Sequence, residues 1–351
     1  MLKKVLLGII ACLLLVSGAD AGFQDVTEDY QLEFPRDLYY KRDYRVQWWY
    51  VTGHLFDEAG REFGYELTFF IVGVQKRAFT SAFGVNNIYI SHFAISDVQR
   101  KKFHFEDRAD SGAFSFAGAD ERELKVWIGR NMLQGTMERI EIRASGREGS
   151  LALVLRPAKP LVLHGDRGYS RKSEGSPLNA SIYFSYTRMD TEGTLKIGGG
   201  ETFAVKGHSW FDREISTQGL DPNKAGWDWF SLQLDDGRDV MLYLIRNRDG
   251  SPDRFSSGTV VLKDGTARHL TADDFRVKVT SRYKSGKTGA HYPSAWEISV
   301  PSQGLELQVT PLIRDQEFVA IGTTGNSYWE GTCLVEGTMA GRAYVEMTGY
   351  D

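Results

Sequence analysis

The segment KGHSWFDREIS, residues 206–216, holds the densest set of side chains that could carry out chemistry. In an extended strand alternate residues share a face, so His208, Trp210 and Asp212 would lie on one wall with neighbours ~6.7 Å apart. Glu214 would continue this wall. A histidine and carboxylates could act as general acid and base, and an indole offers a π surface to a positive charge. The competing interpretation is a solvent-facing strand, against which the tryptophan argues.

A second candidate is the segment AGWDWFSLQLDDG, in which Trp227 and Trp229 flank Asp228. Asp228 shares its predicted face with apolar residues such as Phe230, so the carboxylate should be desolvated, which raises its pKa. The alternative interpretation is an aspartate that caps a turn at the start of the strand. Either way, the two indoles point together to the opposite face of this strand.

The segment VQWWYVTGHL, residues 46–55, carries large aromatic side chains on both faces of one predicted strand. Trp48, Tyr50 and His54 share one face, whereas Trp49 lies on the other. Both faces should therefore be covered. We expect a barrel interior on one side and, on the other, a second barrel or the long Pro- and Gly-rich loop 156–180, with a bound ligand as part of one cover.

Two other kinds of site are disfavoured by the sequence. GHSWF has Phe211 where a G-x-S-x-G nucleophile elbow needs its second glycine, and no amphipathic helix follows. The seven histidines form no H-x-H or H-E-x-x-H pattern, although distant ligands could converge in a barrel. We therefore predict neither a metal site nor a cofactor. His92, in NIYISHFAISD, is expected to be a hydrogen-bonded core histidine.

The elements that must position these residues are strands, because period-two alternation runs along nearly the whole chain. REFGYELTFFIVG is one example, with Phe63, Tyr65 and Leu67 on one face. The dipeptides Asp236-Gly237, Asp249-Gly250 and Asp264-Gly265 are typical of hairpin turns. The sequence thus predicts an all-β, largely antiparallel protein, whose last segment, residues 326–351, is a closing hairpin of mostly structural residues.

A faint internal repeat suggests two units of similar design. WYVTGHLFDEAGREFGYEL from Trp49 and WDWFSLQLDDGRDVMLYL from Trp227 each contain tryptophan, a strand, an acidic turn ending in Gly-Arg and a second strand. Chance is a rival explanation, since such hairpins are common. Two strand-rich units are best built as closed or nearly closed barrels, because closure removes exposed sheet edges.

Length and composition fit a globular protein, and the N-terminal segment indicates a location outside the cytoplasm. The chain has 351 residues, 42% hydrophobic residues and a formal charge of -4, and no basic stripe for nucleic acid. Residues 1–21 are typical of a signal peptide cleaved after Ala21, with lipidation at Cys12 as the alternative. A periplasmic or secreted location is therefore expected. The mature chain keeps only Cys333, which should be a buried apolar side chain without a disulfide.

Five segments in order, QWWYVTGHL, GHSWFDREI, GWDWFSLQLDDGRDVMLY, YPSAWEISVPSQGLELQVTPL and YWEGTCLVEGTMAGRAYVEMTGY, resemble the AttH-like family over nearly the whole mature chain. This family includes hydroxyneurosporene synthase (carotenoid 1,2-hydratase) and many predicted secreted hydrolases. The resemblance implies two tandem lipocalin-like (calycin) barrels, at residues 22–215 and 216–351. It also implies cofactor-free hydration of a terminal isoprenoid double bond. Gln47 departs from the glutamate expected before the double tryptophan.

Together, the residues and the resemblance leave two hypotheses. In the first, the protein binds a lipid or isoprenoid in an aromatic pocket and hydrates an alkene by acid/base chemistry. In the second, it is a non-enzymatic lipid carrier or an accessory protein of a lipoprotein-releasing-type ABC transporter. The predicted site residues are His208, Asp212 and Asp228 for catalysis, and Trp48, Trp49, Tyr50, His54, Trp210, Trp227 and Trp229 for ligand binding.

Overall fold

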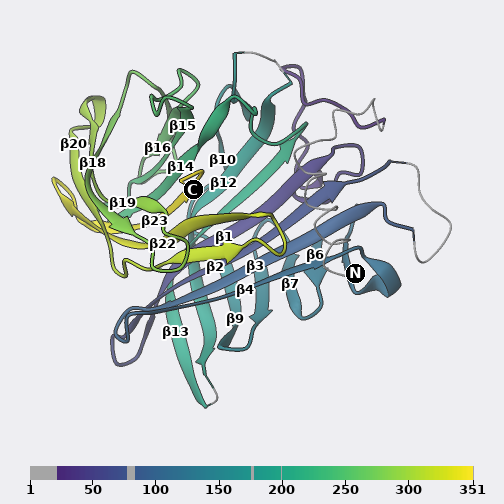
Figure 1. Ribbon diagram of the computed structural model, residues 1–351, viewed down its shortest axis with the longest axis horizontal. Coiled ribbons are helices and arrows are strands. Elements are labelled where there is room, and N and C mark those ends of the chain that lie inside the picture. The colour runs from purple at the N-terminus through teal and green to yellow at the C-terminus, as the bar shows by residue number, and fades with distance from the viewer. Residues whose placement is uncertain (1–21, 77–83, 175–177, 199, 351) are drawn as a thin grey trace.

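The computed structural model describes residues 22–76, 84–174, 178–198 and 200–350. Within these residues the chain forms two antiparallel β-sheets (Figure 1), which confirms the predicted all-β fold. The predicted signal peptide lies outside the described residues. None of the helices in the described part is long and apolar enough to cross a membrane. The described residues also contain three short 3-10 helices between strands: η1 (Arg36–Leu38), η2 (Ala113–Ser115) and η3 (Pro301–Gln303).

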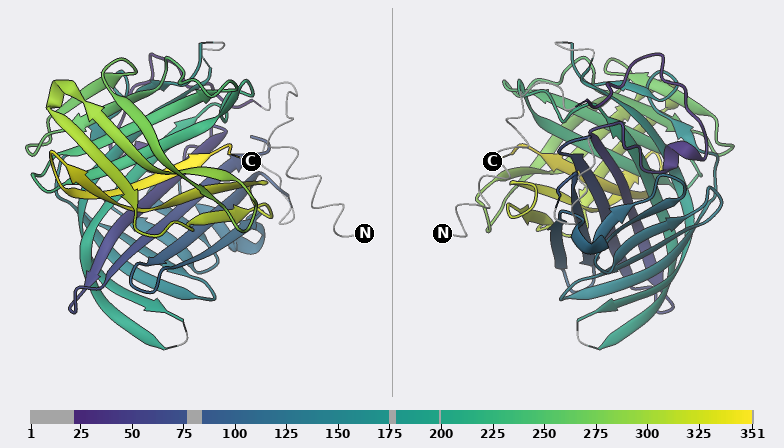
Figure 2. Two further views of the ribbon diagram at one scale, coloured as in Figure 1. Left: turned by 60° about the vertical axis from the view of Figure 1, so that its left-hand side comes forward. Right: turned by 90° about the vertical axis from the view of Figure 1, so that its right-hand side faces the viewer.

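The first sheet has 13 strands in the described residues and curls into a near-closed barrel (Figure 2). Its main order is β4-β3-β2-β1-β13-β12-β9-β8-β7-β6-β5, and β10 and β11 pair with β12. β3 and β4 also contact β6, which brings the two ends of this order together. The strands are β1 (Val46–Asp57), β2 (Glu62–Gly73), β3 (Asn87–Asp97), β4 (Lys102–Asp110), β5 (Ala117–Ala119), β6 (Leu124–Ile128), β7 (Asn131–Gly135), β8 (Ile140–Ser145), β9 (Gly149–Pro157), β10 (Val162–Leu163), β11 (Tyr169–Arg171), β12 (Ala180–Ile197) and β13 (Glu201–Ser216).

The second sheet has 10 strands in the described residues and curls into a half-barrel, less closed than the first (Figures 1 and 2). Its order is β17-β16-β15-β14-β23-β22-β20-β19-β18, and β21 pairs with β22. The strands are β14 (Lys224–Leu234), β15 (Asp239–Asn247), β16 (Ser257–Val261), β17 (Ala267–Thr271), β18 (Arg276–Lys284), β19 (His291–Val300), β20 (Leu305–Pro311), β21 (Glu317–Ala320), β22 (Asn326–Gly337) and β23 (Gly341–Thr348).

Alternation of apolar and polar residues gives each sheet its own inner core. In β9, Leu151, Leu153 and Leu155 are buried while their neighbours are more exposed, so only one face of the strand enters the first barrel. β20 repeats this pattern in the second sheet. Burial of such a side chain contributes about 1.5 to 3 kcal/mol, so the two cores account for much of the stability of each sheet.

The predicted turns and the predicted repeat both appear in the structure. Gly237, Gly250 and Gly265 of the Asp-Gly turns have φ of 88°, 83° and 89°, which a side chain would disfavour. The two repeated segments form the hairpins β1–β2 and β14–β15. These hairpins occupy matching places, since β1 lies between β2 and β13 while β14 lies between β15 and β23.

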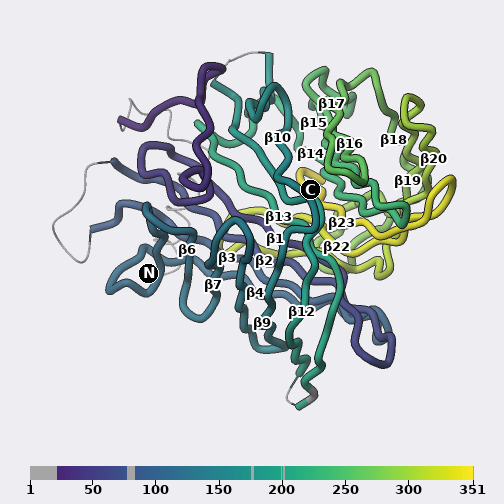
Figure 3. The backbone as a smooth tube through the Cα atoms, turned by 180° about the vertical axis from the view of Figure 1, so that it is seen from behind, coloured from purple at the N-terminus to yellow at the C-terminus, as the bar shows by residue number. Residues whose placement is uncertain are grey.

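The two sheets pack against each other through faces that point away from their own cores. β22 and β23 of the second sheet contact β2 and β1 of the first (Figure 1). Viewed from behind, the second sheet gathers on one side of the first (Figure 3). The chain passes from one sheet to the other between Ser216 and Lys224. The division into domains at residues 22–215 and 216–351 stays a prediction.

Candidate functional site

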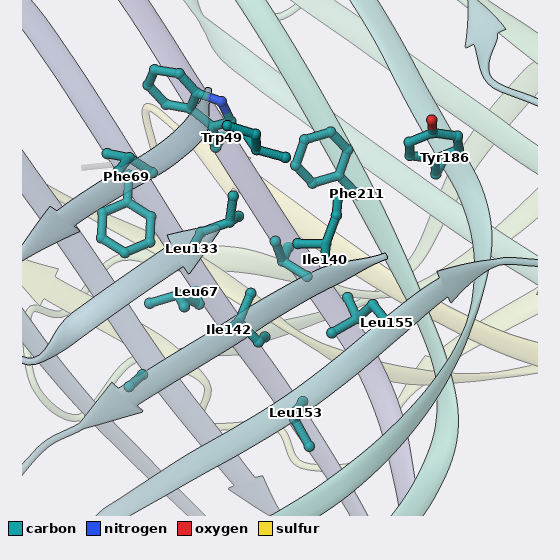
Figure 4. Packing of buried hydrophobic residues seen from close by; sticks show 14 of the residues in the cluster. Trp49, Leu67, Phe69, Leu133, Ile140, Ile142, Leu153, Leu155, Tyr186 and Phe211 are labelled. Atoms are coloured by element: carbon teal, nitrogen blue, oxygen red, sulfur yellow. The ribbon is translucent and has the colours of Figure 1, made fainter. Parts of the chain in front are cut away.

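The strand β1 is covered on both faces, as its sequence predicts. Trp49 lies in the core of the first barrel (Figure 4). Its Nε1 donates to the carbonyl of Leu38 at 2.8 Å. The Arg213 guanidinium stacks 3.9 Å above the Trp49 ring centroid. Tyr50 instead belongs to a separate cluster between the two sheets, and Trp48 packs against that cluster. One cover of β1 is therefore the barrel core, and the other is the second sheet.

Aromatic rings from both sheets meet in this interface. Trp229 of β14 lies edge-on to Tyr50, with ring centroids 5.3 Å apart, and edge-on to Trp210 of β13 at 6.0 Å. Trp48 and Trp227 lie at the margin of the cluster and are only partly buried. Five of the predicted ligand-binding residues are therefore brought together. They form what we call the aromatic wall: Trp48, Tyr50, Trp210, Trp227 and Trp229.

Asp212 lies beside the aromatic wall and is almost fully buried. Its carboxylate accepts hydrogen bonds from Trp210 Nε1 at 2.6 Å, from the Tyr183 hydroxyl at 2.9 Å and from Ser185. Burial raises the pKa of Asp212 to about 7, and nearby Glu214 adds to this shift while the three donors oppose it. Asp212 can therefore hold a proton close to neutral pH.

Three further carboxyl groups complete the interface, and sequence analysis did not single them out. Glu66 of β2, Glu330 of β22 and Glu346 of β23 form what we call the carboxyl cluster. Glu330 and Glu346 are direct partners across the two strands, and Glu66 and Glu330 are fully buried. Burial raises the pKa of each, and for Glu330 the negative charges of Glu66 and Glu346 raise it further. Burial and mutual repulsion therefore keep protons on these carboxyl groups at neutral pH.

Several polar atoms in and beside the carboxyl cluster have no hydrogen-bond partner in the described structure. Tyr50 donates to Oε2 of Glu330 at 3.1 Å, and the Thr68 hydroxyl donates to Oε1 of Glu66. Glu330 Oε1, Glu66 Oε2 and the Tyr344 hydroxyl are buried without a hydrogen-bond partner in the described structure. Unsatisfied buried polar groups are costly and concentrate at functional sites. These atoms are therefore the ones best placed to meet a ligand.

A small cavity adjoins this region. Its volume of about 10 Å³ is space for about one water molecule. It combines residues of both sheets: Thr52, Gly53, His54, Trp210, Ser231, Gln233, Arg342 and Tyr344. Tyr344 of this lining and Glu346 of the carboxyl cluster are two residues apart on β23, so their side chains share a face.

Lys172 supplies a positive charge at the edge of the site. It follows β11 in the predicted long loop, and its Nζ lies 2.9 Å from Glu214 and 4.3 Å from the Tyr243 ring centroid. Burial alone would lower the pKa of Lys172, but Glu214 and Tyr243 reverse that effect and the net shift is upward. Lys172 therefore stays charged and offsets part of the negative charge of the interface.

The two predicted histidines lie away from the carboxyl cluster. His54 Nε2 donates to the carbonyl of Ala343 at 3.1 Å, and Nδ1 lies 2.8 Å from the Thr332 hydroxyl, so His54 joins the two sheets. His208 of β13 is the direct partner of His54 of β1. Its side chain is exposed, and its Nδ1 lies 3.4 Å from Oδ1 of Asp190. An exposed histidine is poorly placed to act on a ligand held in the buried interface.

Asp228 is desolvated as predicted but lies on the opposite face of β14 from the two indoles. Burial raises the pKa of Asp228 to about 6, while Arg246, 3.2 Å away, and Tyr350 oppose the shift. The Tyr350 hydroxyl donates to both carboxylate oxygens, at 2.9 and 3.0 Å. Asp228 therefore anchors the C-terminal segment and is not part of the carboxyl cluster.

The chemistry of the interface is that of carboxyl groups and aromatic rings. Among the residues that the structure describes, no group of three or more His, Cys, Asp or Glu could hold a metal ion. The one signal for the carboxyl cluster was a lone acid inside an apolar strand, as in YEL, WEG and VEM. Such acids are rare in strand interiors, and their clustering depends on how the sheets pack.

Fold and site define an all-β protein of two packed antiparallel sheets with a carboxyl and aromatic site between them. The sequence profile of the AttH-like family matches residues 25–350. The chain belongs to the AttH-like family. The comparison with curated proteins found no match.

Three solved structures share this fold. A candidate AttH from Nitrosomonas europaea is 33% identical, with a TM-score of 0.85 over 94% of this chain and 100% of that one. Kievitone hydratase from Nectria haematococca is 13% identical, with a TM-score of 0.70 over 93% and 96% of the two chains. CghA, solved with Sch210972, is 12% identical, with a TM-score of 0.54 over 95% and 97%. At these identities the last two establish the fold alone.

The raised pKa of Asp212 leads to a prediction about stability and pH. The folded protein holds this proton between the ordinary pKa of 3.8 and about 7, whereas the unfolded chain has lost it. Stability therefore falls as pH rises through this window. We expect Asp212→Asn to flatten that fall by up to about 1.4 kcal/mol per pH unit. Urea unfolding of both proteins from pH 4 to 8 measures the effect, and parallel curves would contradict it.

Proposed function

We propose that the protein binds a hydrophobic small molecule with an isoprenoid-type double bond between its two sheets and adds water to that bond. The carboxyl cluster beside the aromatic wall is the observation that carries this proposal. Protonation of an alkene needs a carboxylic acid that is still protonated at neutral pH, and burial of the cluster supplies it. We also propose, from residues 1–21, that the protein works in the periplasm or outside the cell.

The acid in this proposal is Glu330 rather than His208 or Asp212. Glu330 has an unpartnered oxygen in the interface, whereas both oxygens of Asp212 already accept hydrogen bonds. Glu330 donates its proton to one alkene carbon, which leaves a tertiary cation on the other. Water adds to this cation and releases a proton to the Glu330 carboxylate, so the sum is addition of one water molecule and Glu330 is protonated again.

The aromatic wall has two roles in this reaction. The rings of Tyr50 and Trp229 stabilise the cation, with about 1 to 2 kcal/mol for each contact in a dry site. They also bury the apolar chain of the ligand, at about 25 cal/mol for each Å² removed from water. Asp212 fixes the wall, because it holds the Trp210 indole and the Tyr183 hydroxyl, which in turn accepts from Trp229 Nε1 at 3.0 Å.

A ligand larger than water must displace side chains, because the cavity of about 10 Å³ holds only about one water molecule. Trp48, Phe70 and Trp227 are the partly buried rings at the edge of the interface. Trp48 and Phe70 contact each other across β1 and β2, with centroids 6.4 Å apart. We propose that the ligand enters by moving these rings, which are less tightly packed than the fully buried Trp210.

The relatives support this proposal through their printed names. One structure of similar fold is a hydratase, kievitone hydratase, and another, CghA, was solved with Sch210972. The fold is therefore compatible with water addition and with binding an organic molecule. A carrier that only binds the ligand, alone or as a partner of an ABC transporter, is the second function that the aromatic wall would suit.

Native mass spectrometry of protein purified from the cells that produce it, followed by lipid extraction, tests the binding step. We expect a bound apolar molecule that carries an isoprenoid double bond or the matching tertiary alcohol. Trp229→Ala should lose it, because the ring contacts both Tyr50 and Trp210. Exposed Phe114→Ala is the matched control and should retain it. A water-soluble ligand, or equal retention by Trp229→Ala, would contradict the proposal.

A further inference from the structure

A second cavity lies beside the segment that precedes β1, and none of its lining residues belongs to the aromatic wall or the carboxyl cluster. Its volume of about 490 Å³ falls within the range of small-molecule sites. The lining comes from residues 36–44, Glu121 and Arg122, and we call this cavity the N-terminal cleft. The two parts are joined where Tyr40 N donates to the carbonyl of Asp120, between β5 and β6, at 3.0 Å.

The N-terminal cleft has an excess of positive charge, although the whole chain has a formal charge of -4. Four cations and two acids give its lining a formal charge of +2: Arg36, Lys41, Arg42 and Arg122 against Asp43 and Glu121. Lys41 Nζ also lies 2.7 Å from Asp37, outside the lining. Asp43 in turn lies 2.7 Å from Lys76 Nζ, so these two outer charges cancel.

The arginines of the cleft can turn to a bound anion at little cost. Arg42 Nε donates to Glu121 at 2.7 Å, and both side chains are exposed. Arg36 lies 3.5 Å from Glu33, and this pair is exposed as well. Ion pairs between exposed side chains contribute little to stability. A guanidinium group binds an oxyanion through two parallel hydrogen bonds, so these groups suit a ligand with several charged oxygens.

Tyrosine rings supply the apolar part of the cleft. Tyr40 is buried beneath it, and its hydroxyl donates to Asn87 at 3.2 Å. Tyr39 and Tyr44 are only half-buried, and the Tyr44 ring lies edge-on to Tyr30, with centroids 5.8 Å apart. Half-buried rings gain from covering by a flat or apolar group. The lining therefore combines cations with apolar surface.

Two buried side chains hold the backbone of the cleft in place. The Gln47 amide accepts from Lys41 N at 2.9 Å and donates to the carbonyls of Lys41 and Tyr44 at 2.6 and 3.1 Å. Arg213 Nη2 donates to the carbonyl of Tyr39 and to Gln47 Oε1, both at 2.8 Å. A loop fixed in this way loses little freedom when a ligand binds.

We propose that the N-terminal cleft binds a phosphate monoester carried on an apolar or aromatic group. Such a phosphate has a charge of about -1.5 to -2 at neutral pH, which matches the lining, whereas a carboxylate supplies only one charge. Its oxygens accept from Arg42 and Arg122, and the apolar group packs against Tyr39 and Tyr44. The inference does not depend on the proposed function, because the cleft and the carboxyl cluster share no residue.

Titration calorimetry of the full chain with phenyl phosphate tests this site. Inorganic phosphate and phenol, the two parts of the probe, should each bind at least about 10-fold more weakly. Arg122→Gln should weaken phenyl phosphate binding by about 10-fold, because one charged donor is lost. Arg143→Gln changes an exposed arginine of β8 outside the cleft and should bind like the wild type. Added salt should weaken binding by screening the charges.

Glu121→Gln should have the opposite effect. It removes the acid that competes for Arg42, so the affinity for phenyl phosphate should rise by about 2- to 5-fold. Arg122 and Glu121 are both exposed, so neither substitution removes a buried contact. A residue that only maintains the local structure would not produce this gain.

The outcomes decide the site and the source of the phosphate. Absence of saturable binding, or equal affinities of wild type, Arg122→Gln and Glu121→Gln, would overturn the inference. Equal binding of phenol or of inorganic phosphate would overturn the combined recognition of phosphate and apolar group. Sedimentation with phosphatidylcholine vesicles that contain phosphatidic acid, lost in Arg122→Gln, would support a lipid as the source. Binding of phenyl phosphate without sedimentation would support a free small molecule.

Discussion

Asp239→Ala is expected to lower the free energy of unfolding by about 3 to 5 kcal/mol. Asp239 is fully buried in β15 and accepts from Lys159 Nζ at 2.5 Å, from Arg188 Nη2 at 2.7 Å and from Thr187 at 2.9 Å. These partners belong to the first sheet and its long loop. Removal of the carboxylate leaves the buried Lys159 and the partly buried Arg188 without this counter-charge, which costs more than the ion pairs contribute to stability.

Urea unfolding at pH 7 measures this loss, and an exposed ion pair provides the control. Arg156 and Glu192 lie 3.0 Å apart, and about half of each side chain is exposed, at 50% and 53%. Glu192→Ala should therefore change the free energy of unfolding by about 1 kcal/mol at most. Equal effects of the two substitutions would show that the Asp239 network does not hold the sheets together.

Glu330→Gln is expected to reduce the rate of hydration by about 10²- to 10⁴-fold, the usual contribution of a positioned general acid. Glutamine has the shape of glutamic acid and still accepts from Tyr50, which donates to Glu330 at 3.1 Å, but it cannot give up a proton to an alkene. Ligand affinity should stay within about 10-fold of the wild type, because the apolar contacts are unchanged. Rates from product formation and affinities from titration separate the two effects.

Glu336→Gln is the matched control for this substitution. Glu336 lies on the same strand, β22, but its side chain is exposed. The control should hydrate the ligand at the wild-type rate. If Glu330→Gln also retains that rate while binding normally, the acid is a different group, and Glu66 is then the next candidate because its Oε2 is also unpartnered.

Much of the fold could be predicted from local pattern. Alternation along β1 correctly separated Trp49, in the barrel core, from Tyr50, in the sheet interface, because a strand has only two faces. The Asp-Gly turns and the two matching hairpins were local signals of the same kind. The sequence did not indicate that the second sheet would stop at a half-barrel, since closure depends on how distant edges meet.

The candidate site was predicted only in part, for a physical reason. Trp210 and Asp212 were identified because their neighbours in sequence are also their neighbours in space. Glu66, Glu330 and Glu346 come from three strands of two sheets, so each looks like an isolated acid in its own segment. His208 shares a strand face with Asp212 but lies where β13 is exposed. Alternation along a strand predicts which face a side chain lies on, but it does not predict whether the second sheet covers that part of the face.

Incubation of the protein with isoprenoid alkenes in ¹⁸O-labelled water tests the central claim most directly. Suitable probes are geranylgeraniol, squalene and a prenylated phenol, each bound first to the wild type and to Glu330→Gln. The account predicts a tertiary alcohol that carries ¹⁸O with at least one probe in the wild type, and none with Glu330→Gln. Probes that bind the wild type and are recovered without ¹⁸O would contradict hydration and make the protein a carrier.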